Sequence, residues 1–373
     1  MHRFNLQHID WWIVTPVMML LFFSTITMGS FGTGHGYLLR QTVWSLIALG
    51  IMFSVARTDV SFLKKPWTLF SLFMVSNGLL LLVMLIGKTA NGAKSWFDFG
   101  GISFQPSDLV KLVLILMLAK YLSRRHVEIA NIKHLLITGL YCIIPFGLVF
   151  LQPDFGSAII FGMIWFGMMM VSGLSKKHLV ILTIVGLVAG GILWGFVFKP
   201  YQKDRILNFL NPLADIRGSG YNAYQSMIAV GSGQIIGKGV GFGTQSRLNF
   251  LPEYQTDFIF AAFAEEWGFI GALIVLSCFT IILWRVLRLA RGGTTNFETL
   301  YAVGVCVYFM SHVIINIGMN IGVLPVTGIT LPFMSYGGSH LIAECLALGI
   351  LFSLFRYRRD VHRDDMAHEF LGA

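Results

Sequence analysis

The feature that most constrains this chain is a series of long apolar segments. A helix that crosses the hydrocarbon core of a bilayer needs about 20 mostly apolar residues. Segments of this kind lie at residues 11–29, 38–56, 66–87, 106–122, 134–151, 157–173, 178–198, 267–284, 299–320 and 339–356. The composition agrees, because 55% of the residues are hydrophobic and only 12% are charged. The sequence therefore predicts an all-α integral membrane protein, a single polytopic membrane domain over residues 1–373 with about ten transmembrane helices.

The basic residues fall into alternate connections between the predicted helices. Cytoplasmic loops of membrane proteins carry an excess of Lys and Arg. With the N-terminus in the cytoplasm, the inner segments hold Arg3, Arg57, Lys64, Lys65, Lys120, Arg124, Arg125, Lys133, Lys176, Lys177, Arg285, Arg288, Arg291, Arg356, Arg358, Arg359 and Arg363, and the short outer loops hold only Lys88 and Lys94. This pattern predicts that the N- and C-termini are cytoplasmic. It also accounts for the net charge of +9 without a nucleic-acid partner.

One connection is much longer than the others. Residues 199–256 join the seventh and eighth predicted helices on the outer side. A loop of this length in a compact protein is usually either functional or disordered. Ile, Leu, Phe and Tyr occur throughout it, which is a poor composition for disorder. We therefore expect a large, ordered extracytoplasmic loop subdomain that lies on the membrane.

Several patterns predict packing rather than chemistry. Gly186, Gly190, Gly191 and Gly195 have the small-xxx-small spacing of closely packed membrane helices. The four cysteines lie in apolar runs and form no CxxC pair, so neither a disulfide framework nor a zinc site is expected. The glycine run around Lys238 does not fit a nucleotide-binding P-loop, because Gly rather than Ser or Thr follows the lysine. No organic cofactor is predicted.

The stretch "LPEYQTDFIFAAFAEEWGFIG" (251–271) places four acids, Glu253, Asp257, Glu265 and Glu266, beside a lipid-facing segment. The uncharged run that follows them is about 27 Å long as a helix and nearly spans the hydrocarbon alone. The acids can therefore lie at the outer mouth of the helix bundle. Asp257 and Glu265 would be about 12 Å apart on a helix, too far for a glycosidase-type carboxylate pair. Asp257 is then either a helix cap or a general base at this mouth.

Three cations need an explanation. Lys111 and Asp108 are three residues apart at the start of the fourth span, where a lysine opposes the helix dipole. Lys111 either pairs with Asp108, snorkels to the interface or binds an anionic ligand. Arg40, near the outer end of the second span, either snorkels or binds phosphate. Lys238 and the surrounding glycine amides either approach an anionic headgroup or belong to a chain of turns.

The segment "NIGMNIGVLPVTGITLPFMSYGGS" (316–339) is uncharged and interrupted by proline and glycine. Irregular backbone at membrane depth occurs where it is buried in protein or lines a cavity. This segment is therefore predicted to form a cavity wall. The neighbouring intramembrane residues His312 and Glu344 are expected to make structural hydrogen bonds.

The stretches "NGAKSWFDFG", "FQPSDLVKL", "LQPDFGSA", "YQSMIAVGSGQIIGKGVGFGTQSRLNFLPEYQTDFIFAAFAEEWGFIG" and "NIGMNIGVLPVTGITLPFMSYGGS" together resemble the SEDS (shape, elongation, division and sporulation) family over residues 10–357. The stretch "GTQSRLNFLPE" is more similar to the rod-shape members than to the division members. The resemblance implies ten transmembrane helices and a peptidoglycan glycosyltransferase in the bacterial cytoplasmic membrane. Such an enzyme polymerises lipid II at the outer face, with undecaprenyl pyrophosphate as the leaving group. A class B penicillin-binding protein and other elongation-complex membrane proteins would be its partners.

The same resemblance implies roles for individual residues. Asp257 falls on the catalytic aspartate of the family pattern, and Trp96 falls on the tryptophan after the third span. Asp108 and Lys111 fall on the family's acidic and basic pair, with Asp at 108 where the family usually has Glu, and Glu344 is atypical for the last span. Arg40, Lys111 and Lys238 are expected to contact the pyrophosphate, with Mg²⁺ or Mn²⁺ as a helper. Further substrate contacts are expected at Asp154, Gln225, Ser226, Gln245, Glu253, Thr256 and Ser335.

Two other functions fit the same features. A flippase for lipid-linked precursors would also use many helices and a polar cavity, but transporters usually hold their site near the bilayer midplane between repeats. Here the polar groups are predicted at the outer ends, and the sequence has no evident repeat. A non-catalytic scaffold for a transpeptidase is the third interpretation.

Overall fold

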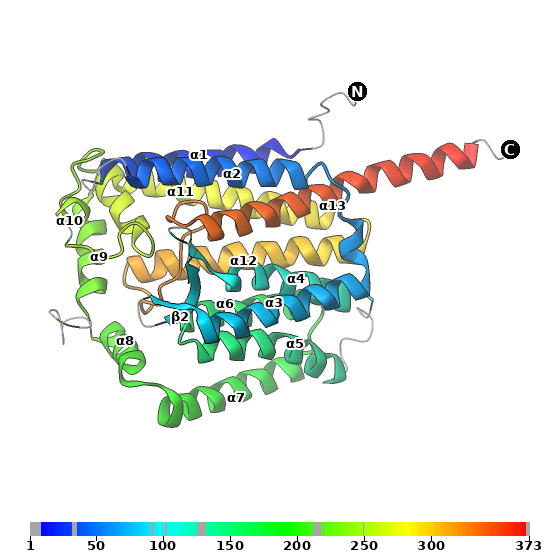
Figure 1. The fold of residues 1–373 in the computed structure, drawn as a ribbon, viewed down its shortest axis with the longest axis horizontal. Coiled ribbons are helices and arrows are strands. Elements are labelled where there is room, and N and C mark those ends of the chain that lie inside the picture. Colours follow the sequence, from blue (N-terminus) through cyan, green and yellow to red (C-terminus); the bar gives the residue numbers. More distant parts are fainter. Residues whose placement is uncertain are drawn as a thin grey trace.

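The structure is a computed structural model that describes residues 9–31, 36–90, 93–98, 100, 103–124, 132–211, 218, 220–248 and 250–370. Each of the ten predicted spans coincides with a helix in this part of the chain. They are α1 (Trp11–Ser30), α2 (Gly36–Val55), α3 (Pro66–Ile86), α4 (Pro106–Ser123), α5 (Ile132–Leu151), α6 (Phe155–Val171), α7 (Lys176–Ile192), α11 (Ile259–Arg291), α12 (Asn296–Asn320) and α13 (Gly338–Phe370). In Figure 1 these helices run side by side, and α1 begins at the end of the bundle where α13 finishes.

Eight of the described helices are long and apolar enough to cross a membrane. Two further helices, α4 and α6, match predicted spans but fall short of this standard of length and apolar composition. Helix α6 is apolar but has only 17 residues, and α4 carries Asp108, Lys111 and Lys120. The chain is therefore a multi-span membrane protein, as predicted. Which end of the bundle faces the cytoplasm stays a prediction.

Helix α12 lies at the centre of the bundle, whereas α7 lies at its edge. In the most apolar window of α12, 83% of the residues are buried, against none in α7. Helix α12 packs on α4, α6, α11 and α13, and Gly167 on α6 makes room for the side chain of Val307. The close packing predicted for Gly186, Gly190 and Gly191 of α7, and for Gly195 just beyond it, is not formed within the described part of the chain, because a Cβ at any of them would meet nothing within 4 Å. An entirely apolar helix can be covered by lipid instead.

The long connection between α7 and α11 gathers at one end of the bundle (Figure 1). After the π-helical turn Leu193–Val197, its described part contains α8 (Pro200–Leu210), α9 (Tyr221–Ser232) and the short α10 (Thr244–Arg247). Helix α9 packs on α11 and α12. The position of this connection on the outer side of the membrane remains a prediction.

A small sheet after α3 was not anticipated from the sequence. Strands β1 (Lys88–Ala90), β2 (Ala93–Asp98) and β3 (Ser103–Phe104) form an antiparallel sheet in the order β1-β2-β3. In β2, Ser95 and Phe97 are buried while Asp98 is exposed, the alternation expected of a strand with one face covered. The sequence suggested only a short loop here, because the strands are too short for a clear periodic signal.

Helix α11 begins eight residues before its predicted start and breaks at Gly268. This glycine has φ 67° and ψ −165°, a conformation open to glycine but not to residues with a Cβ. The glycine-rich segment, residues 231–243, packs against this break. There the amides of Phe269 and Ile270 donate to the carbonyls of Gln234 (2.9 Å) and Ile235 (3.1 Å). Residues 259–267 are therefore a separate helical segment of about two and a half turns, and Glu265 and Glu266 lie on it.

Candidate active site

Asp257 lies in a tight turn immediately before α11. The carbonyl of Glu253 accepts hydrogen bonds from the amides of Thr256 (3.1 Å), Asp257 (3.1 Å) and Phe258 (3.2 Å). The N-cap of α11 is Phe258, and the side chains of the preceding turn make no capping hydrogen bond to this helix. The helix-capping alternative for Asp257 is therefore wrong, because its carboxylate does not bind the helix end.

Two asparagines of α12 fix the backbone at Asp257. The side-chain amides of Asn316 and Asn320 donate to the Asp257 carbonyl at 2.9 and 3.1 Å. Asn320 also accepts from the amide of Ala261 at 3.0 Å, and Asn316 donates to the carbonyl of Ile329 at 2.7 Å. The pair joins the Asp257 turn, the start of α11 and the segment after α12. The sequence reading missed it, although two asparagines four residues apart in an apolar span are a signal.

The irregular segment between α12 and α13 forms one wall beside Asp257. Gly328 has φ +75°, and a Cβ there would lie 3.3 Å from the carboxylate oxygen Oδ2 of Asp257. The hydroxyl of Ser335 donates to the carbonyl of Thr256 (2.7 Å) and accepts from the amide of Leu331 (2.8 Å). This segment, which was predicted to form a cavity wall, thus contacts the Asp257 turn through its backbone and through Ser335.

The surroundings of Asp257 favour its protonated form. Burial, followed by the nearby carboxylate of Glu253 and that of Asp154, raises the pKa of Asp257 to about 7, while the guanidinium of Arg205 opposes the shift. A carboxyl group with such a pKa can accept a proton and release it again near neutral pH, which suits a general base.

Arg205, on α8, is a candidate that the sequence reading missed. Its half-buried side chain lines two small cavities of about 30 and 20 Å³, which share Pro325 and Val326. Within the described chain, no hydrogen bond or ion pair to its guanidinium is found. Its only sequence signal is a basic residue in the amphipathic stretch "YQKDRILNFL". A half-buried guanidinium without a protein partner, beside a carboxyl group, is suited to an anionic ligand.

Several predicted site residues lie around this turn. Asp154 caps α6 by accepting from the amide of Ser157 (3.0 Å) and also accepts from Gln105 (3.0 Å). Thr256 donates to the carboxylate of Glu253 at 3.1 Å. Arg40 is exposed near the start of α2, where Tyr37 packs edge-on against Tyr336 at 5.2 Å between ring centroids. The start of α2 therefore adjoins the segment that carries Ser335.

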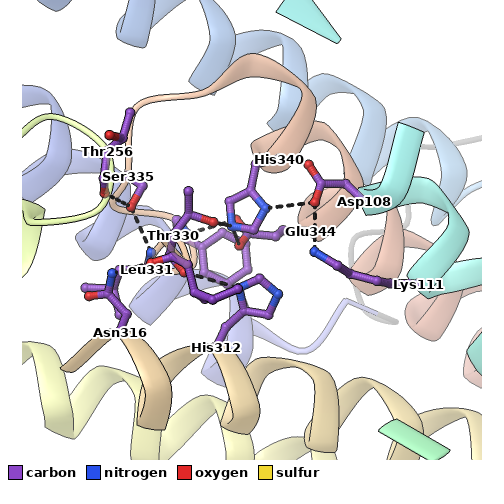
Figure 2. Close-up of polar contacts among 12 residues, drawn as sticks. Asp108, Lys111, Thr256, His312, Asn316, Thr330, Leu331, Ser335, His340 and Glu344 are labelled. Carbon is purple, nitrogen blue, oxygen red and sulfur yellow. Dashed lines mark hydrogen bonds and ion pairs between the residues drawn. The ribbon is translucent and has the colours of Figure 1, made fainter. Parts of the chain in front are cut away.

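The Asp108–Lys111 pair lies deeper, behind this segment (Figure 2). The Nζ atom of Lys111 lies 3.1 Å from Oδ1 of Asp108, and their side chains are 2% and 3% exposed. The predicted ion pair is confirmed, whereas snorkelling of Lys111 is wrong. His312 contacts the carbonyl oxygen of Thr330 at 3.1 Å, which agrees with the structural hydrogen bond expected of it.

The remaining predicted residues are spread over neighbouring elements. Lys238 pairs with the buried Glu265 at 2.7 Å, whose carboxylate also accepts from the amide of Gln245. Ser226 on α9 donates to the carbonyl of Asn320 at 2.9 Å, and Gln225 precedes it. Trp96 lies half-buried in β2, and no contact described here joins it to Asp257. Contact of these residues with substrate stays a prediction.

The predicted divalent cation lacks an evident ligand set. In the described part of the chain, no group of three or more His, Cys, Asp or Glu side chains is arranged to hold a metal ion. A divalent cation at the site stays a prediction.

Comparison with known sequences relates the whole chain to one group of proteins. A family profile described as cell cycle protein, FtsW/RodA/SpoVE, matches residues 4–360. The chain is 35% identical over 366 residues to the probable peptidoglycan glycosyltransferase FtsW of Coxiella burnetii, covering 92% of this chain and 95% of that protein. It is 39% identical over 326 residues to the stage V sporulation protein E of Bacillus subtilis, with coverages of 86% and 87%. It is 35% identical over 353 residues to the peptidoglycan glycosyltransferase MrdB of Escherichia coli K12, with coverages of 94% and 95%.

Solved structures agree with the sequence comparison. A chain of a peptidoglycan synthase complex, described as coordinating polymerization and crosslinking, superposes with a TM-score of 0.80 at 32% identity, covering 94% of this chain and 98% of that chain. The rod shape determining protein RodA of Thermus thermophilus superposes with a TM-score of 0.71 at 30% identity, with coverages of 94% and 97%.

Proposed function

This chain belongs to the FtsW/RodA/SpoVE, or SEDS, family, and on that premise we propose that it is a peptidoglycan glycosyltransferase that polymerises lipid II in the bacterial cytoplasmic membrane. The observation that supports this function best is the setting of Asp257. Its backbone is held by two asparagines, and burial raises its pKa to about 7. The guanidinium of Arg205 on α8 interacts with its charge and has no hydrogen bond or ion pair to the residues that the structure describes. The site thus combines a base with an anion-binding group.

The proposed reaction is an inverting displacement at the anomeric carbon of the donor sugar. Asp257 takes the proton from the O4 hydroxyl of the acceptor sugar as this oxygen attacks the anomeric carbon. The bond from that carbon to the pyrophosphate oxygen breaks, and undecaprenyl pyrophosphate leaves with the electron pair. We assign to Arg205 and to the exposed Arg40 the stabilisation of the departing negative charge. Lys111 and Lys238, by contrast, are paired with Asp108 and Glu265.

We further propose that the enzyme acts in cell elongation beside a class B penicillin-binding protein and other elongation-complex membrane proteins. The stretch "GTQSRLNFLPE" supports this branch of the family. The relatives carry names from division, sporulation and rod-shape proteins alike, so complementation of an elongation-defective strain is the appropriate test. Restoration of division alone would contradict this assignment.

The experiment that tests the enzymatic function uses the purified full chain, a transpeptidase-inactive class B partner and labelled lipid II. Growth of a glycan ladder on a gel supports the proposal. A flippase would instead move lipid II across liposomes without forming polymer, and that translocation would be unaffected in Asp257→Ala. A scaffold would do neither. Absence of polymer from the wild-type chain under these conditions would overturn the proposed function.

The pH dependence of kcat/KM is expected to rise with pH through about 7 and then level off. The ionised carboxylate is the form that accepts a proton, and the pKa of Asp257 lies near 7. Because the charge of Glu253 helps to raise that pKa, Glu253→Gln should move the rising limb to lower pH. Initial rates of polymerisation in matched buffers measure both effects. A limb that does not respond to Glu253→Gln would contradict the assignment of this pKa to Asp257.

A further inference from the structure

A second group of charged residues is buried behind the wall of the site. Asp108, Lys111, His340 and Glu344 are all at most 4% exposed. Besides the pair between Lys111 and Asp108, Nδ1 of His340 lies 3.6 Å from Oδ1 of Asp108, and its Nε2 lies 2.7 Å from Oε1 of Glu344. Figure 2 shows the imidazole of His340 between the two carboxylates. Helices α4 and α13 are thus joined through one histidine.

Charge balance gives this histidine a specific task. Buried charges are costly unless they are paired, and removal of one partner leaves the others uncompensated. Lys111 can balance one of the two carboxylates, Asp108 and Glu344. His340 is the remaining basic group of the cluster, and a proton on its ring makes the sum of the four charges zero. The second histidine here, His312, donates from Nδ1 to the backbone carbonyl of Thr330 rather than to a carboxylate.

His340 and Glu344 also contact residues 328–335, the wall segment that lies between α12 and α13. Nε2 of His340 lies 2.7 Å from the hydroxyl of Thr330. The carboxylate of Glu344 accepts from the amide of Phe333 at 2.8 Å, and Phe333 has φ +59°, an unfavourable conformation for a residue with a Cβ. Such a conformation persists only where surrounding contacts impose it. The contact with Glu344 is one of those that impose it here.

The wall segment is in turn hydrogen-bonded to the turn that contains Asp257. Ser335 donates to the carbonyl of Thr256, the residue before Asp257. Asn316 bridges the carbonyls of Ile329 and Asp257, and Gly328 lies against the Asp257 carboxylate. A displacement of residues 328–335 therefore changes both the position and the burial of that carboxylate.

We propose that His340 and Glu344 are positioning residues, which hold residues 328–335 in the conformation that places Asp257 for proton transfer. They touch neither substrate nor the reacting atoms. This inference rests on the proposed function, because its readout is the polymerisation of lipid II. Asp108, one methylene shorter than glutamate, takes part in the same cluster. Its carboxylate contacts Lys111 and faces the imidazole of His340.

The test compares His340→Gln and Glu344→Gln with the wild-type chain in the polymerisation assay. A displaced base lowers the rate of the chemical step more than substrate binding, so kcat should fall by about 10- to 100-fold while KM changes little. Looser packing also exposes Asp257, so the rising limb of the pH profile should move to lower pH. The other charges that face Asp257 (Glu253, Asp154 and Arg205) are unchanged in both variants. Because the two residues act together, the double variant should lose less than the product of the single losses.

A matched control is His134→Gln. His134 is also buried in the membrane region, but it contacts the hydroxyl of Tyr121 at 2.9 Å and lies on α5 away from the wall segment. This variant should keep the wild-type kcat and pH profile. Glu344→Gln keeps an acceptor for the Phe333 amide, so it supplies the test if His340→Gln does not fold.

The outcomes separate this inference from the proposed function. If the wild-type chain polymerises lipid II and Asp257→Asn does not, the function stands. Wild-type kcat and an unshifted pH limb in both His340→Gln and Glu344→Gln would then overturn the positioning role. A reduced amount of folded protein with unchanged kcat and pH profile would also overturn it, since it would assign the cluster to stability alone.

Discussion

Asp257→Asn is expected to lower the rate of glycan polymerisation by about 100- to 10,000-fold, the usual contribution of a general base. The amide has nearly the shape of the carboxyl group but cannot accept the proton of the acceptor hydroxyl. The contacts that hold the turn use the backbone of residue 257, so they remain. The measurement is the initial rate of polymer formation from labelled lipid II. Asp59→Asn, outside the site between α2 and α3, is the matched control and should behave like the wild-type chain.

The stability of the same variant provides an independent check. The folded chain holds the Asp257 proton more tightly than the unfolded chain does, because the pKa of this group is raised to about 7. Between its ordinary pKa and about 7, ionisation therefore weakens folding as the pH rises. The uncharged Asn removes this cost, so at pH 8 the variant should be at least as stable to heat as the wild-type chain. Loss of activity with lower stability at pH 8 would indicate misfolding rather than loss of a base.

Glu265→Ala is expected to cause the second large effect, a loss of stability at the end of the bundle that carries Asp257. The fully buried carboxylate pairs with Lys238 at 2.7 Å and accepts from the amides of Thr244 (2.8 Å) and Gln245 (3.1 Å). Each buried donor left without an acceptor costs about 1–3 kcal/mol, so a loss of about 2–6 kcal/mol follows from the two amides. The ammonium group of Lys238 is partly exposed and adds less.

Thermal unfolding and limited proteolysis of residues 233–248 measure this effect. Glu265→Gln is the matched variant, because its amide oxygen still accepts from the backbone while the charge opposite Lys238 is lost. We expect a smaller destabilisation for Gln than for Ala and earlier cleavage of the segment only in the Ala variant. Equal stability of wild type and Glu265→Ala would show that the glycine-rich segment is held by its backbone contacts to the α11 break alone.

The sequence allowed the helices and the local contacts to be predicted, because both depend on short stretches. Runs of about 20 apolar residues located the spans, and the i,i+3 spacing located the Asp108–Lys111 pair. Each of these signals lies within one element. The position of Asp257 at the end of the bundle followed from the length of the apolar run after it.

Other features depend on contacts between distant parts of the chain. Asn320 meets Asp257 across 63 residues, and the break at Gly268 is set by the segment that docks against it, which a single helical pattern cannot indicate. Arg205 resembled any other charge of a mixed loop until the fold placed it beside Asp257. The position of α7 at the edge of the bundle likewise depends on which helices pack against one another. The spacing of its glycines did not predict this packing.

The release of undecaprenyl pyrophosphate during polymer growth tests the central claim most directly. Purified wild-type chain and Asp257→Asn are incubated in parallel with doubly labelled lipid II and a transpeptidase-inactive partner, and lipid product and polymer are counted together. We predict one undecaprenyl pyrophosphate released for each disaccharide joined by the wild-type chain, and almost none of either product from Asp257→Asn. Equal release and polymer formation by the two proteins, or no polymer from the wild-type chain, would contradict the account.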